Sequence, residues 1–185
     1  MSRQFWMELI TWATADATAV ANTTTETILF PNVTIPANYM QDGRCLRITA
    51  FGKYSTTGTP TMIFGLRWGG VAGTLLTKTA AITTPSGVTN ATWELDIFIQ
   101  TRANGATGKL IANGTCTVFA GVAPTVASAT GNAAVTPLTN GGTITPAEVT
   151  VDLTADTALA LTLTWSAASA SNTATGMQYE LESRN

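Results

Sequence analysis

The chain has 185 residues, of which 45% are hydrophobic and 11% are charged, and its formal net charge is −2. This length suits one domain with a substantial hydrophobic core, and the thinly spread basic residues exclude a patch that would neutralise the phosphates of a nucleic acid. Histidine is absent, so the commonest general base and metal ligand is missing, and no apolar run is long enough to span a membrane.

Residues 1–23 form an arm rich in alanine and threonine, with Phe5, Trp6 and Trp12 near its start. A terminal segment that carries tryptophans is usually docked on something, because exposed indoles at a free end are a liability. The arm packs either on its own domain or on a neighbouring subunit. On the second alternative, Phe5, Trp6 and Trp12 are the candidate interface residues. The short apolar run interrupted by Glu8 lacks a good cleavage site, so we expect synthesis in a reducing cytoplasm.

Residues 24–185 are predicted to form a β-sandwich domain, because apolar and small polar residues alternate along most of this region. Such a period of two directs one row of side chains to a core and the other row outward. Turn residues separate the predicted strands, which cover residues 24–30, 33–35, 44–54, 62–68, 75–79, 92–101, 109–119, 148–153, 159–166 and 177–181. In the last of these, we expect Met177, Tyr179 and Leu181 to face the core.

The segment of residues 121–147 breaks this pattern, since it consists of alanine, threonine, glycine, valine and proline with weak periodicity. It is long for a loop without structure, so we expect it to carry a function or an extra edge strand.

With the short pieces at residues 33–35 and 75–79 set aside, about eight strands and no amphipathic helix predict an all-β protein, a jelly-roll-like antiparallel β-sandwich with an N-terminal arm. An immunoglobulin-like sandwich is the main alternative, but its Cys–Trp–Cys signature is missing.

The alternation also assigns faces to the conspicuous side chains. Trp68, Trp93 and Trp165 fall on the apolar rows, which predicts three core tryptophans rather than exposed platforms. Cys45 and Cys116 fall on rows with different surroundings, which favours two free thiols over a disulfide.

The sequence contains few side chains that are candidates for catalysis or metal binding. Glu94 and Asp96 share one face of a strand, as a pair for glycoside hydrolysis would, but this is the outer face, so we expect a solvated surface or a contact between subunits. Asp152 and Asp156 are conceivable calcium ligands, although a role in capping a turn fits them better. We therefore expect no enzyme, no catalytic residue, no metal and no cofactor.

Three phrases of the chain resemble virion structural proteins of tailed bacteriophages: IPANYMQDGRCLRITAFG at residues 35–52, GTPTMIFGLRWG at 58–69, and WELDIFIQTR at 93–102. The resemblance covers most of residues 24–183 and rests on strands and turns rather than on a catalytic signature. It implies a jelly-roll capsid decoration (cement) protein on the outside of the phage capsid. The implied partners are two further copies in a homotrimer and the major capsid protein, without nucleic acid or membrane.

A rival hypothesis from another class is a tail or head-fibre module that binds glycans of the host surface. This alternative predicts exposed aromatic side chains at one end of the sandwich.

Overall fold

The structure is a computed structural model that describes residues 7–119, 133–139 and 147–184. These residues form fourteen strands and no helix. The strands are β1 (Met7–Trp12), β2 (Val20–Ala21), β3 (Thr27–Ile28), β4 (Val33–Ile35), β5 (Cys45–Thr56), β6 (Thr61–Trp68), β7 (Thr74–Thr79), β8 (Ile82–Thr83), β9 (Val88–Ala103), β10 (Gly108–Phe119), β11 (Ala133–Thr139), β12 (Val149–Val151), β13 (Thr157–Trp165) and β14 (Thr173–Arg184).

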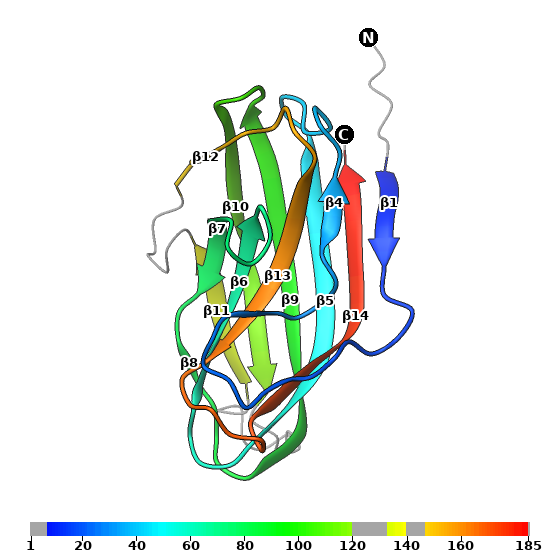
Figure 1. Cartoon of the computed structure of the whole chain (residues 1–185). Helices are drawn as coiled ribbons and strands as arrows, with labels where there is room; N and C mark the ends of the chain where they lie inside the picture. Colours follow the sequence, from blue (N-terminus) through cyan, green and yellow to red (C-terminus); the bar gives the residue numbers. More distant parts are fainter. Residues whose placement is uncertain (1–6, 120–132, 140–146, 185) are drawn as a thin grey trace.

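The strands build two antiparallel sheets that pack face to face (Figure 1). One sheet has the order β1-β14-β5-β9-β10, and the other places β3 and β4 beside β13, followed by β6 and β7. The first strands of the chain thus lie next to the last ones, while β5, β6, β7, β9 and β10 complete the two sheets. This order is that of a jelly roll, in which two Greek keys wrap around one core. The prediction of an all-β jelly roll is confirmed.

Strand β11 lies inside the segment of residues 121–147, where the sequence indicates an extra edge strand. It pairs with β10 over six residues, from Gly114↔Leu138 to Phe119↔Ala133, and with β7 through Leu138↔Thr79 and Thr139↔Lys78. The strand is therefore flanked on both sides and joins the two sheets. Residues 120–132 and 140–146 lie outside the described part of the chain.

Within the predicted arm, residues 7–21 run along β14 (Figure 1). Strand β1 pairs with the end of β14 and β2 with its beginning. Between them, the amides of Ala13 and Ala17 donate to the carbonyls of Tyr179 and Gly176, each at 2.8 Å. This part of the arm thus packs on its own domain.

The core forms where the apolar rows of the two sheets meet. Trp93 and Trp165 are 0% and 1% exposed, and the ring of Trp93 lies 5.1 Å from that of Phe64 in the opposite sheet. Each buried indole N–H has a carbonyl acceptor, which removes the penalty of burying it. The prediction that Trp68, Trp93 and Trp165 face inward is confirmed.

A close approach next to Trp93 explains the glycine at position 52. A Cβ atom there would lie 2.1 Å from the carbonyl oxygen of Thr175 and 2.2 Å from Cζ2 of Trp93. Only glycine lets β5 pass the indole at this point.

Two details of the predicted strands are wrong. Met177 does not face the core but is 40% exposed, because the register shifts between Gly176 and Gln178 and moves the side chain outward. The predicted strand of residues 24–30 shrinks to the two residues of β3, because the chain bends at Leu29 and Phe30, both of which are buried.

Both cysteines are free, as predicted. Cys116 is fully buried, and this burial raises the pKa of its thiol. Cys45 is half-buried at the start of β5, on the outward row, so the two sulfur atoms occupy separate environments.

Candidate functional site

The predicted carboxylate pair lies on the outer face of β9, where the sequence places it. Asp96 is bound by the guanidinium of Arg47 in a bidentate arrangement, with distances of 2.8 Å and 2.7 Å. Glu94 lies two residues away in the same row, opposite Phe51 on β5 and Thr117 on β10. The pair thus belongs to an open sheet surface, with one member held in an ion pair.

The two aspartates near β13 both act in turns. Oδ1 of Asp152 accepts hydrogen bonds from the backbone amide and the hydroxyl of Thr154 at 2.8 Å and 2.6 Å, which lowers the pKa of Asp152. Oδ1 of Asp156 accepts from the amide of Ala37 at 2.8 Å. Within residues 7–119, 133–139 and 147–184, no group of three or more acidic, cysteine or histidine side chains is placed to hold a metal ion.

The outer side of the sheet formed by β3, β13, β6 and β7 is built from small and apolar residues. In β6 the buried Met62 and Phe64 alternate with outward Ile63 and Gly65, and the register places Thr164 beside Ile63. We call this surface the small-residue face. Its accessible members are Ile28, Ile63, Leu75, Ala158 and Thr164, with Glu26, Arg67 and Lys78, whereas Gly65, Ala160 and Thr162 of the same outward rows are buried beneath them.

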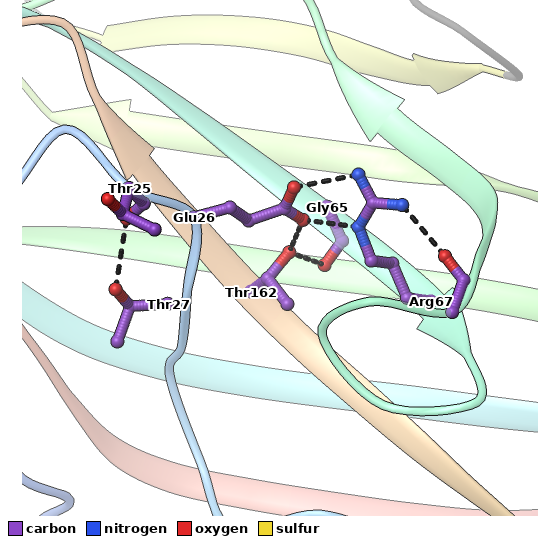
Figure 2. A network of polar contacts seen from close by, with 7 residues as sticks. Thr25, Glu26, Thr27, Gly65, Arg67 and Thr162 are labelled. Atoms are coloured by element: carbon purple, nitrogen blue, oxygen red, sulfur yellow. Dashed lines mark hydrogen bonds and ion pairs between the residues drawn. The ribbon is translucent and has the colours of Figure 1, made fainter.

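An ion pair crosses the small-residue face (Figure 2). Nε of Arg67 donates to one carboxylate oxygen of Glu26 at 2.6 Å, and the terminal nitrogen of Arg67 donates to the other at 2.7 Å. The hydroxyl of Thr162 lies 2.6 Å from Glu26 Oε1 and 3.1 Å from the carbonyl oxygen of Gly65. Arg67 also donates to the carbonyl oxygen of Gly73 at 2.9 Å.

The environment of Glu26 favours its charged form. Burial by itself would raise the pKa of this carboxyl, but the hydrogen bonds from Arg67 and Thr162 outweigh burial and leave the pKa lowered. Gly65 provides the space, because a Cβ atom there would lie 2.8 Å from Thr162 Oγ1 and 3.3 Å from Glu26 Oε1. The two charges thus neutralise each other on an otherwise small and apolar surface.

The opposite outer surface, formed by β1, β14, β5, β9 and β10, has a different character. It carries exposed apolar side chains between ion pairs, and Arg47 and Arg184 lie over the ring of Phe98 at 5.4 Å and 5.9 Å. We call this surface the aromatic face, and its exposed members are Met7, Leu9, Trp12, Phe98 and Met177.

Trp12 is the predicted interface residue that the structure describes, while Phe5 and Trp6 lie outside the described residues. The register pairs Trp12 with Glu180 on β14, and its ring is 57% exposed. Trp12 lines two hollows of about 350 Å³ and about 540 Å³, which also share Ala13 and Tyr179 in their walls.

Phe51 is a surface aromatic residue that the sequence interpretation missed. It lies across the smaller hollow from the arm and is half-buried on the outward row of β5. Phe51 could have been identified as a surface residue from its alternation, since it follows Cys45, Arg47 and Thr49 on the outward row of the strand.

No protein-family model, curated protein or solved structure matches this chain. In the part of the chain that the structure describes, no helix could cross a membrane.

Proposed function

We propose that this protein is a structural component of a tailed-phage virion, a decoration (cement) protein that binds the outside of the capsid and reinforces contacts between shell subunits. Its partners are the major capsid protein and further copies of itself in a homotrimer. The jelly-roll fold and the resemblance of the strand and turn phrases both support this role, although a fold alone does not define a function.

The observation that carries the proposal is the small-residue face. Covering a charged surface is costly unless each charge finds a partner. On this face Glu26 and Arg67 already satisfy each other at 2.6 Å and 2.7 Å, so only Lys78 adds a further charge. The accessible uncharged side chains of this face are isoleucine, leucine, alanine and threonine, which suit close, shape-matched contact with another protein.

Four of the five carboxylates discussed above, all except Glu94, support a role without catalysis. Asp96 and Glu26 are held by arginines, and Asp152 and Asp156 bind backbone amides of turns. With no histidine in the chain, no described serine or cysteine has the usual base beside it.

The proposal is tested by Ile63→Lys, which places a charge on the small-residue face, next to Thr164. We expect this variant to fold, because Ile63 is only half-buried, and to lose self-association and binding to undecorated particles by a factor of about 10 or more. The matched control is Thr115→Lys on the opposite face, which should bind normally. Equal binding by both variants would refute the assignment of this face.

A second candidate function is a tail or head-fibre module that binds host surface glycans, and the exposed ring of Trp12 favours it. Counting copies per particle separates the two candidates. Hundreds of copies mean cement, whereas a handful mean a tail or fibre component.

A further inference from the structure

We infer that the aromatic face carries a binding site for a neutral saccharide chain, centred on Trp12. This site would lie on the side of the sandwich opposite the small-residue face. It does not depend on the cement role, because an outward-facing surface of a head protein and that of a fibre module are equally free to bind a glycan.

The exposed indole is the first observation. Trp12 is 57% exposed, whereas Trp68, Trp93 and Trp165 are 6%, 0% and 1% exposed. An exposed aromatic ring offers a flat apolar surface on which the C–H face of a sugar ring can stack. In β1 the register shift between Leu9 and Thr11 turns Trp12 to the outer side, opposite Glu180.

The shape around the ring suits a chain of sugars rather than a single one. The smaller hollow, of about 350 Å³, extends from Trp12 over β14 to Phe51 on β5. The larger hollow, of about 540 Å³, lies between residues 10–17 and residues 30–34. Both hollows have Trp12 in their walls, so a chain of sugars that occupied both would contact this one side chain, and both volumes lie in the range of ligand sites.

The polar groups in the smaller hollow match the hydroxyls of a sugar. Its walls include the hydroxyl of Thr49, the amide of Gln178 and the carboxylate of Glu180. Gln178 and Glu180 are exposed and Thr49 is half-buried, so their donors and acceptors are accessible to a ligand. Asn32 and Thr34 supply a further amide and hydroxyl in the larger hollow.

Other ligands fit this lining less well. An apolar peptide would cover Thr49, Gln178 and Glu180 without giving them partners, which is unfavourable. A lysine or arginine side chain would find one unpaired carboxylate, Glu180, because Asp16 in the larger hollow already lies 3.6 Å from Lys53. A neutral saccharide uses the aromatic ring and the polar groups together.

The test uses the full-length protein and neutral oligosaccharides of glucose, galactose, mannose and N-acetylglucosamine in α and β linkages. We expect at least one of them to bind at millimolar concentration or below, seen by saturation-transfer NMR and by a change in tryptophan emission. Trp12→Ala should weaken binding by a factor of about 10 or more, and Trp12→Phe should restore part of it.

Met7→Ala is the matched control, because Met7 is exposed on the same strand but lines neither hollow. Three results would each overturn the inference: no binding of any oligosaccharide, equal binding by Trp12→Ala and the unmodified protein, or binding of a lysine-rich peptide alone. The Ile63→Lys variant should bind the saccharide normally, so failure of the cement role and failure of this site are distinguishable.

Discussion

Individual residues on the small-residue face combine burial with charge. Glu26 and Arg67 have side chains that are 25% and 23% exposed, and each provides the partner that the other requires. The hydroxyl of Thr162 and the missing Cβ of Gly65 complete the arrangement. The ion pair therefore connects the segment before β3 to β6, and it passes over the intervening strand β13.

Replacing Glu26 with glutamine tests this attachment through the dependence of stability on pH. The lowered pKa of Glu26 means that its contribution is complete above the usual value of 4.5 and is lost as the pH falls through the folded-state value. We expect Glu26→Gln to lower the free energy of unfolding by about 1–3 kcal/mol at pH 7 and by much less at about pH 3.

Urea denaturation of both proteins at the two pH values measures this difference. An equal loss at both pH values would show that Glu26 acts through packing alone.

For single residues, the sequence predicts on which face of a sheet a side chain lies, but not which residues the side chain contacts. The alternation placed Trp68, Trp93 and Trp165 correctly, because a strand fixes the direction of every second side chain. It could not reveal that Glu26 meets Arg67 and Thr162, since these residues are far apart in the chain and come together only through the order of the strands. It also missed Phe51, because the interpretation followed the tryptophans.

Among the elements, β1 follows the first of the two alternatives for the arm, because it packs on its own domain. The composition separates residues 1–23 as an arm, yet Met7–Trp12 forms a paired strand beside β14. Glu8 accepts a hydrogen bond from the hydroxyl of Tyr39 at 2.7 Å, which adds a side-chain contact to the pairing. This strand covers the hydrogen-bonding edge that β14 would otherwise expose.

Deleting residues 2–12 should therefore affect the fold as well as binding. We expect a loss of about 2–3 kcal/mol, seen as a fall in Tm of about 4–10 °C, together with association at the bared edge of β14. Calorimetry and size-exclusion chromatography measure these effects. Trp12→Ala is the control, since removal of an exposed ring should shift the Tm by no more than about 2 °C. An unchanged Tm after the deletion would mean that β1 contributes nothing to the isolated domain.

Strand β1 could not be predicted because six residues with a register shift show no clean alternation. An extra edge strand was one of the two alternatives expected for residues 121–147, but β11 is paired on both sides and is therefore not an edge strand. Its pairing with β7 connects residues more than fifty positions apart, and no local pattern of alanine and threonine encodes such a contact.

For the whole molecule, the two outer faces differ in charge. The small-residue face has one neutralised pair and Lys78, whereas the aromatic face holds the pairs Arg47–Asp96, Lys53–Asp16 and Arg184–Glu182. Self-association through the small-residue face should therefore respond weakly to salt.

We expect the dissociation constant of the proposed trimer to change by less than about threefold between about 0.05 M and 0.5 M ionic strength. Sedimentation equilibrium over this range provides the measurement. A tenfold weakening by salt would instead indicate ion pairs between copies and would favour the aromatic face as the contact.

The jelly-roll fold as a whole could be predicted, because length, strand number and turn spacing restrict an all-β chain to few architectures. The pairing of the first strand with the last could not, since it depends on tertiary packing.

The two sheets are joined differently at the two sides of the sandwich, because β11 connects them by strand pairing at one side only. Backbone hydrogen bonds run from β10 through β11 to β7, whereas no strand pairing links the described parts of β1 and β4. Transient separation of the layers should therefore start at the β1–β4 margin, which borders the larger hollow beside Trp12. A molecule seated in that hollow would hold together the margin that loosens first, so occupancy there would raise the resistance of the entire domain to unfolding.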